Sequence, residues 1–380
     1  MLPFTRLSVS GERFCVAYRL VGTEAEARAK AADICVEQTI EFPAELVPDD
    51  DIRAHIFGRV EDFHPLGENS YQAIISYAVE ITAFELPQLL NVIFGNISLK
   101  PGIRMEWIDI PDELLKAFPG PSFGRAGLRE LLQIHNRPLL CSALKPMGLP
   151  IEVLADIAYR LARGGVDLIK DDHGLTNQGF SPFKERVERC AEAVAKANRE
   201  TDGRTLYVPN VTGPAEHAIK RALFAKEAGA GGVLISPGLV GFDTMARLAE
   251  DPRLKLPILC HPAFLGAFIV SQDHGVSHYA LFGQLMRLAG ADVIIFPNYG
   301  GRFAFTKEEC ASIVKGTQVP MGHLKSIFPA PSGGMSLERV QEMVDFYGQE
   351  VVLLIGGDLH RHGRDLAATS ERFRKFVGAL

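Results

Sequence analysis

From residue 137 to the end of the chain, short apolar segments alternate with helical patterns, and this alternation restricts the fold more than any other feature. Val166–Ile169 is one such segment, and Gly164-Gly165 separate it from the amphipathic pattern of Glu152–Arg163. Short apolar runs of this kind are typical of strands buried on both faces of a parallel sheet. Eight are expected, at Leu139–Lys145, Val166–Lys170, Thr205–Val211, Gly232–Ser236, Ile258–His261, Asp292–Pro297, Ile327–Pro331 and Val351–Ile355.

Eight strand–helix units in about 240 residues match a TIM (β/α)8 barrel. A doubly wound open sheet is the alternative, but no G-x-G-x-x-G follows the first strand. Before this region, the segments follow the order β-α-β-β-α-β, which predicts a ferredoxin-like α+β domain. Its segments are 12–22, Glu24–Cys35, Val36–Ile40, Tyr71–Ile81, Thr82–Phe94 and Arg104–Ile108.

A passage rich in proline and glycine, Phe118–Gly124, marks a linker between the two regions. We therefore expect an α/β chain with two domains. Residues 1–125 form the N-terminal α+β domain, and residues 126–380 form the catalytic barrel.

Polar, charged or glycine residues follow nearly every expected barrel strand at its C-terminal end. Because these ends form the active-site mouth of a barrel, the residues there are candidates for the site. In strand order they include Lys145, then Lys170, Asp172 and His173, then Asn210, His261, Arg302, Ser332-Gly333-Gly334 and Gly356-Gly357.

The cluster after the second strand reads Lys170, Asp171, Asp172, His173. Strand alternation places Lys170 and Asp172 on one side and turns Asp171 to the other. Asp172 and His173 are metal-ligand types, but two adjacent side chains are too few for a stable site. Lys170 has three possible roles: an anionic ligand after carbamate formation with CO2, a cation paired to Asp172, or a general base with a lowered pKa.

The other candidates have distinct roles. Lys145 is suited to stabilise an enediolate oxygen or, when neutral, to take a proton. Glycine turns after strands seven and eight favour phosphate binding through backbone N–H groups, as barrels often show there. His261 is equally compatible with a structural and a catalytic role. Asn210 and Arg302 are candidates for polar contacts to substrate.

Composition excludes several classes of protein. The 380 residues are 47% hydrophobic and 23% charged with a net charge of −6, which fits a globular enzyme and gives no reason to expect nucleic-acid binding. No signal peptide and no transmembrane run is expected. No C-x-x-C pair occurs among the cysteines, so a reducing, cytoplasmic setting fits best; they are Cys15, Cys35, Cys141, Cys190, Cys260 and Cys310.

Taken together, these motifs resemble the RuBisCO superfamily, and specifically its RuBisCO-like (form IV) proteins. The resemblance runs from about Glu37 to the end of the chain. It rests on Gly164–Asp172, which is similar to the family's carbamylated-lysine signature, and on further segments in matching order. These are Gly120-Pro121, Asn136–Leu140 before Lys145-Pro146, His274-Gly275, Leu288–Asp292, Ser332–Gly334 and Gly356-Gly357.

The resemblance implies a role for each matching position. Lys170 matches the lysine that becomes a carbamate, and Asp172 matches a metal-ligating aspartate, with one Mg²⁺ per site. Lys145 matches a lysine of enolisation, and His261 an active-site histidine. The glycine turns and Ser332 match substrate or phosphate contacts. Small-domain residues of the family reach the active site of a second subunit, so a homodimer with shared sites is implied; the matching residues here are Glu37 and Asn96.

Three departures argue against carbon fixation. His173 stands at the third metal-ligand position, where the family pattern has a glutamate. The run after strand six, Asn298–Phe303, lacks the family's lysine, and Pro262 replaces an arginine that binds a second phosphate. A chain without these groups lacks the means to hold a bisphosphate and to fix CO2.

The first hypothesis is therefore an enzyme that forms an enolate from a monophosphorylated keto-sugar or keto-acid, followed by isomerisation, decarboxylation or C–C cleavage. One such substrate is 3-oxo-isoapionate 4-phosphate. The alternative is a methylthioribose-salvage enolase or isomerase, and His173 and Pro262 lead away from the enolase, whose metal triad resembles that of the carboxylases. A phosphosugar-binding protein without catalysis is the hypothesis from another class.

Overall fold

A computed structural model of the chain describes residues 5–48, 50–301, 303, 305–363 and 365–379. The chain forms two compact units. The first lies within residues 1–119, 265–285 and 319–324, and the second within residues 120–264, 286–318 and 325–380.

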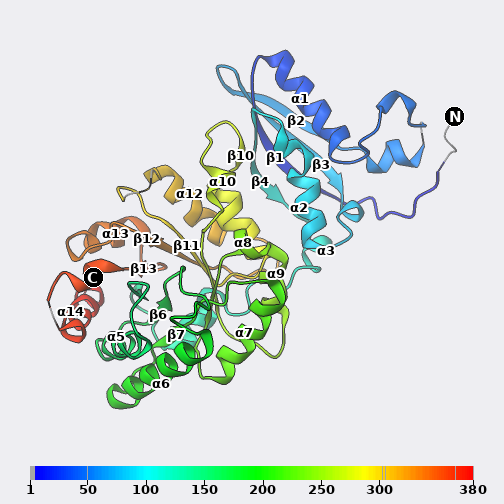
Figure 1. Cartoon of the computed structure of the whole chain (residues 1–380). Coiled ribbons are helices and arrows are strands. Elements are labelled where there is room, and N and C mark those ends of the chain that lie inside the picture. Colours follow the sequence, from blue (N-terminus) through cyan, green and yellow to red (C-terminus); the bar gives the residue numbers. More distant parts are fainter. Residues whose placement is uncertain (1–4, 49, 302, 304, 364, 380) are drawn as a thin grey trace. The chain divides into compact units, whose positions relative to one another are not determined.

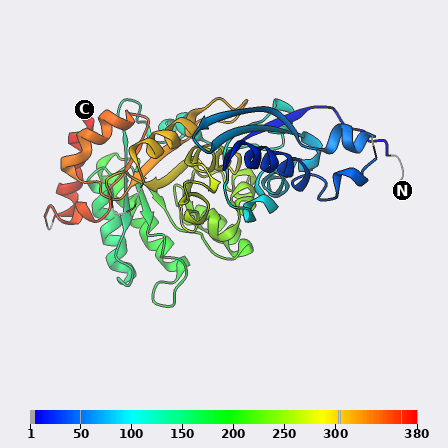
Figure 2. The ribbon, with the colours of Figure 1, turned by 90° about the horizontal axis from the view of Figure 1, so that it is seen from above.

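The first unit is built on a five-stranded sheet with the strand order β10-β4-β1-β3-β2. β1 pairs antiparallel with both β3 and β4, and β2 pairs antiparallel with β3. Helix α1 lies along one face of this sheet (Figures 1 and 2). The order is the expected ferredoxin-like one, with β1 Arg13–Val21, α1 Glu24–Glu37, β2 Arg59–Gly67, β3 Ser70–Ala78, α2 Leu86–Phe94 and β4 Ile103–Asp109, to which are added α3 Asp112–Leu115, α10 Gly266–Ile269 and β10 Gly275–Val276.

The second strand of this unit is β2, so the prediction of a strand at Val36–Ile40 was wrong. Helix α1 begins at a capping box between Thr23 and Glu26 and continues through Glu37, so the start of the predicted strand is helical. The true strand is mostly exposed and lacks the apolar alternation that reveals a strand in a sequence.

The second unit contains an eight-stranded parallel sheet with the order β7-β6-β5-β13-β12-β11-β9-β8, of which β6, β7, β11, β12 and β13 are labelled in Figure 1. Backbone hydrogen bonds join the two ends of this order, since Val211 N–H donates to Leu234 O and Gly231 N–H donates to Tyr207 O, both at 2.9 Å. The sheet is thus a near-closed barrel, as predicted. All eight expected strands are present, as β5 Leu139–Leu144, β6 Leu168–Asp171, β7 Leu206–Val208, β8 Val233–Ile235, β9 Ile258–Cys260, β11 Val293–Pro297, β12 Phe328–Ser332 and β13 Val352–Leu354.

Buried apolar side chains from these strands fill the barrel interior and form one cluster with Leu128 and Leu132 of α4. Interior packing of this kind makes a barrel a filled core rather than a pore. Outside the barrel strands, the unit contains α4 Gly124–Leu132, α5 Ile151–Arg163, α6 Phe183–Thr201, α7 Ala215–Glu227, α8 Pro237–Val240, α9 Phe242–Glu250, α11 Met286–Leu288, α12 Lys307–Gln318, η6 Leu337–Arg339, α13 Val340–Tyr347, η7 Gly357–His360 and α14 Leu366–Gly378.

Asp292, immediately before β11, ties three segments of this unit together. Its Oδ1 accepts hydrogen bonds from the N–H groups of Phe123 (2.8 Å) and Gly124 (2.7 Å), and its Oδ2 accepts one from Ile258 (2.9 Å). Burial raises the pKa of this carboxyl to about 6, although the three N–H donors act in the opposite direction.

No helix in the described part of the chain is long and apolar enough to cross a membrane. All six cysteines are free thiols, and five of them are buried, as is usual for cysteines that act as small apolar residues.

Candidate functional site

Two lysines and an aspartate meet where β5 and β6 end. Lys145 directly follows β5, and its Nζ lies 2.8 Å from Oδ1 of Asp172, which directly follows β6. Lys170 lies within β6 and is 3% exposed, with its Nζ donating to the backbone carbonyl of Asp171 at 3.1 Å. The sequence analysis predicted that these three side chains would gather at the barrel mouth, and the structure brings them together.

Asp171 turns to the other side of the strand, as the alternation predicted. Its carboxylate accepts hydrogen bonds from the Tyr207 hydroxyl (2.8 Å), the Arg186 Nε (3.2 Å) and the Asn210 backbone N–H (3.1 Å). Asp171, Arg186 and Asn210 are 0% exposed, and Tyr207 is 1% exposed. This buried network fixes the end of β6 against α6 and β7.

Asn210 supports the loop that follows β6. Its Nδ2 donates to the carbonyl oxygen of His173 at 2.8 Å, and its Oδ1 accepts from the N–H of Thr212 at 3.1 Å. The side chain is therefore engaged with backbone groups on both sides. Through these bonds it holds His173 in place.

The rings of His173 and His261 are stacked, with centroids 4.4 Å apart and planes 6° from parallel. Nδ1 of His261 accepts the backbone N–H of Ala263 at 3.2 Å, which leaves the proton of the neutral imidazole on Nε2. Nδ1 of His173 lies 3.3 Å from Oδ1 of Asp172. The two imidazoles thus border the pair of Lys145 and Asp172.

Burial and neighbouring charges shift the pKa values of Lys170, His261 and Asp172. Burial lowers the pKa of Lys170, and burial together with the nearby Lys170 lowers that of His261 to about 2. Burial alone would raise the pKa of Asp172, but His173 and Lys145 lower it well below its usual range. Asp172 is therefore a carboxylate at neutral pH.

Oδ1 of Asp172 is buried, and no donor is aligned with it for a hydrogen bond, although Lys145 and His173 lie close to it. A buried carboxylate oxygen without an aligned donor is rare in native proteins and needs an explanation. It has a lone pair available for a cation or a substrate hydroxyl.

The predicted phosphate-binding turns follow β12 and β13. Gly333 and Gly334 have φ angles of +82° and +66°, a conformation that glycine adopts without strain. A Cβ atom at Gly334 would lie 3.0 Å from Cα of Gly301, while one at Gly333 would meet open space. Gly356 and Gly357 also face open space, and Ser332 ends β12 with its Oγ donating to Phe296 O at 3.1 Å.

Two predicted residues belong to the first unit, where Nδ2 of Asn96 donates to Oε1 of Glu37 at 3.1 Å. The structure therefore brings these two together. Arg302, predicted to contact substrate, lies outside the described residues.

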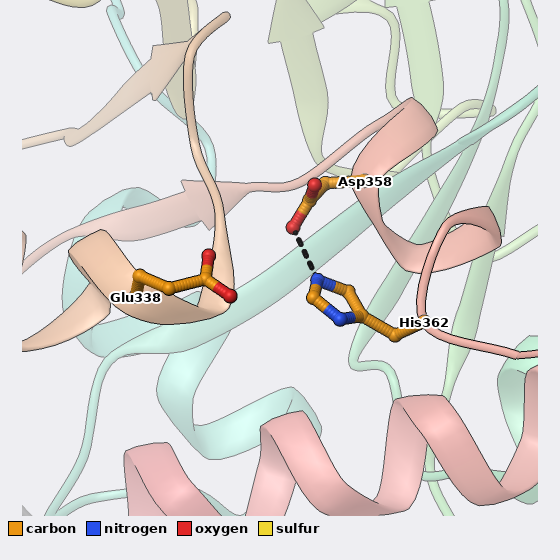
Figure 3. A group of neighbouring side chains, drawn as sticks. All are labelled: Glu338, Asp358 and His362. Atoms are coloured by element: carbon orange, nitrogen blue, oxygen red, sulfur yellow. Dashed lines mark hydrogen bonds and ion pairs between the residues drawn. The ribbon is translucent and has the colours of Figure 1, made fainter.

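A further group of side chains, which the sequence analysis did not identify, lies on the loops after β12 and β13. Glu338, Asp358 and His362 point toward one another (Figure 3), and His362 Nε2 lies 2.9 Å from Oδ2 of Asp358. The spacing of Asp358 and His362 by four residues is a weak signal. Glu338 comes from another loop, and only the folded chain shows that it is near.

The comparisons with known proteins agree with this architecture. The family of the ribulose bisphosphate carboxylase large chain, catalytic domain, matches residues 124–380. A 5-methylthioribulose-1-phosphate isomerase from Rhodospirillum rubrum is 39% identical over 92% of this chain and 91% of its own length. A 2,3-diketo-5-methylthiopentyl-1-phosphate enolase from Geobacillus kaustophilus is 33% identical over 96% and 92%.

Among solved structures, a Rubisco-like protein from Rhodopseudomonas palustris has a TM-score of 0.87 and 38% identity, and the match covers 96% of this chain and 97% of that one.

Proposed function

Since the chain is a RuBisCO-like protein of the ribulose bisphosphate carboxylase large-chain family, we propose that it forms an enolate from a phosphorylated keto-sugar and does not fix CO2. One observation carries the proposal: Lys145, Lys170 and Asp172 come together at the mouth of the barrel, where the Lys145 ammonium lies 2.8 Å from a buried carboxylate oxygen of Asp172. Proton abstraction beside a carbonyl needs a base and a cation for the developing oxyanion, and this cluster offers both.

The two lysines are suited to different tasks. Burial lowers the pKa of Lys170, which favours the neutral amine, the form that takes a proton or reacts with CO2 to give a carbamate. The side chain of Lys145 is 43% exposed and paired to Asp172, and its ammonium would supply the positive charge that an enolate oxygen needs. His261, neutral and with its proton on Nε2, is a hydrogen-bond donor beside them.

The residues at the end of β6 fit one Mg²⁺ ion. Oδ1 of Asp172 and a carbamate on Lys170 would supply the oxygen ligands that Mg²⁺ prefers, and the imidazole of His173 would be the third ligand, of a kind more typical of transition metals. The set carries one negative charge less than a set with glutamate in place of His173. When bound, the metal would polarise the substrate carbonyl and lower the pKa of the neighbouring C–H group.

Phosphate binding is proposed at the turns Gly333-Gly334 and Gly356-Gly357. The loops after strands seven and eight commonly hold phosphate in this fold, and the absence of side chains permits close approach to the backbone. Ser332 lies beside the first turn. Pro262, in place of the family's arginine, is consistent with a single phosphate on the substrate.

The comparisons change the ranking of substrates. The isomerase from Rhodospirillum rubrum, 39% identical, supports 5-methylthioribulose 1-phosphate as the first substrate to test. The enolase from Geobacillus kaustophilus, 33% identical, makes 2,3-diketo-5-methylthiopentyl 1-phosphate the second. The third substrate to test, motivated by His173 and Pro262, is 3-oxo-isoapionate 4-phosphate, by decarboxylation or C–C hydrolysis.

The proposed cellular location and oligomeric state are those expected for the family. We propose a cytoplasmic homodimer in which Glu37 and Asn96 of one subunit complete the site of the other. The hydrogen bond between Asn96 and Glu37 holds the two side chains together, which supports a shared role.

The test is to incubate the protein, activated with bicarbonate and Mg²⁺, with each of the three phosphates in deuterated water. Phosphorus and proton NMR then identify the product and any deuterium incorporated. We expect isomerisation with the first substrate and deuterium at the carbon beside the carbonyl. Binding of a phosphate without turnover or exchange of any of the three would favour the phosphosugar-binding protein instead.

A further inference from the structure

We propose that Glu338, Asp358 and His362 form a binding site for a divalent transition-metal ion such as Zn²⁺. The site is separate from the proposed Mg²⁺ position at Lys170 and Asp172. It goes beyond the proposed function, because neither enolate formation nor phosphate binding at the glycine turns requires it.

The distances between the three side chains match those around a metal ion. All three ligand atoms lie within 4.8 Å of one another, and Nε2 of His362 is 2.9 Å from Oδ2 of Asp358. A tetrahedral ion with bonds of about 2.0–2.1 Å keeps its ligand atoms about 3.3 Å apart. Two of the donors are thus already close to this separation, and Glu338 is exposed, so it can complete the set by rotating its side chain.

The donor set favours a transition metal over Mg²⁺. One imidazole nitrogen and two carboxylate oxygens are typical ligands for Zn²⁺ and its neighbours, whereas Mg²⁺ prefers oxygen alone. Two carboxylates balance the charge of a divalent ion when the imidazole is neutral. Three protein ligands leave a fourth position open, and an anionic oxygen of a ligand or a water molecule is suited to it.

The fold holds these donors in place from two loops. Asp358 lies in η7 and His362 follows one turn later, with side chains only 17% and 23% exposed. The ring of His362 packs edge-on against Phe373 of α14, with centroids 5.8 Å apart, which fixes the plane of the imidazole. Glu338 approaches from η6 on the other loop (Figure 3).

A simple ion pair is the competing explanation, and the first unit provides an example of one. His64 and Asp62 lie 2.7 Å apart, with side chains 44% and 52% exposed. Within the described part of the chain, no third ligand atom lies near that pair, whereas Glu338 lies near Asp358 and His362. The pair of His64 and Asp62 is therefore a matched control.

The experiment is calorimetric titration of Zn²⁺ into the full-length protein after chelator treatment, without bicarbonate. We expect the affinity for one Zn²⁺ equivalent to fall by at least about tenfold in each of three variants, His362→Ala, Asp358→Asn and Glu338→Gln. His64→Ala should bind as the wild type does. His173→Ala reports on any zinc held at the barrel mouth, which distinguishes failure of this proposal from failure of the proposed function.

Unchanged stoichiometry and affinity in His362→Ala and Asp358→Asn would overturn the proposal, as would an equal loss in His64→Ala. If the variant at Asp358 or at His362 does not fold, Glu338→Gln still tests the proposal, because Glu338 is exposed and its substitution should leave the fold intact. Anomalous diffraction at the zinc edge gives an independent answer. A peak among the three side chains supports the site, and crystals soaked in Zn²⁺ without that peak contradict it.

Discussion

Asp171 and Asp172 are neighbours in sequence and opposites in their surroundings. The carboxylate of Asp171 is fully buried and accepts hydrogen bonds from Tyr207, Arg186 and the backbone of Asn210. Asp172 faces Lys145 and His173, and its Oδ1 has no aligned donor. A carboxylate whose hydrogen bonds are complete stabilises the scaffold, while one whose hydrogen bonds are incomplete is available for chemistry.

The largest effect is expected on the side of Asp172. Lys170→Met retains volume at a buried position but removes the amine, so turnover should fall by about 10²–10⁴-fold. Stability should be retained, because burial already disfavours the charged amine. The assay is NMR turnover, combined with thermal melting and with metal analysis after incubation in bicarbonate and Mg²⁺. Equal metal content in wild type and variant would argue against the carbamate.

On the side of Asp171 the expected effect is on stability. Arg186→Met leaves the Asp171 carboxylate buried without its cation, which should cost about 3–5 kcal/mol. Both side chains of this pair are 0% exposed, so solvent does not screen the interaction. Urea unfolding measures the loss. Arg189→Met on the same helix, where the side chain is 60% exposed, is the matched control and should unfold nearly as the wild type does.

A third aspartate, Asp292, is buried with backbone N–H donors and, among the described residues, has no ion pair within 4.0 Å. Its pKa is about 6 in the folded chain, against about 4 for an unfolded one, so the folded state binds the proton more tightly. The stability that this group contributes therefore increases as the pH falls from about 6 to 4, by about 2–3 kcal/mol.

Asp292→Asn removes this dependence, so the wild type should gain stability relative to the variant over that range. Unfolding of both proteins in urea between pH 4 and pH 7 provides the measurement. A difference that stays constant, or that shrinks on acidification, would show that the three donors outweigh burial.

The smallest effect is expected for Tyr207→Phe, which removes one of the three hydrogen bonds to Asp171. A hydrogen bond to a charged group contributes about 1.5–3 kcal/mol, and the remaining partners limit the loss to the lower part of that range. Tyr159→Phe is the control, since its hydroxyl meets Glu200 at the surface, and no measurable change is expected. A larger loss than that of Arg186→Met would reverse the assignment of the main partner of Asp171.

The sequence predicted the barrel well because its strands are short, apolar and buried on both faces. It also predicted the opposite orientations of Asp171 and Asp172, since strand alternation determines them. It failed at β2, whose exposed residues carry no apolar alternation.

Contacts between distant segments were beyond the reach of the sequence. No local sequence pattern indicates that Arg186 and Tyr207 contact Asp171. The same is true of Glu338, which lies near His362 only in the folded chain. The stacking of His173 on His261 likewise depends on two strands that are neighbours only after the barrel has formed.

Exchange of a carbon-bound substrate hydrogen with solvent deuterium would show enolate formation at this site. We would measure it by proton NMR with 5-methylthioribulose 1-phosphate in wild type and Asp172→Asn, at a temperature where both are folded. We expect exchange in the wild type and its loss in Asp172→Asn without a change in melting temperature. Equal exchange in both proteins, or a bound substrate that does not exchange in the wild type, would contradict it.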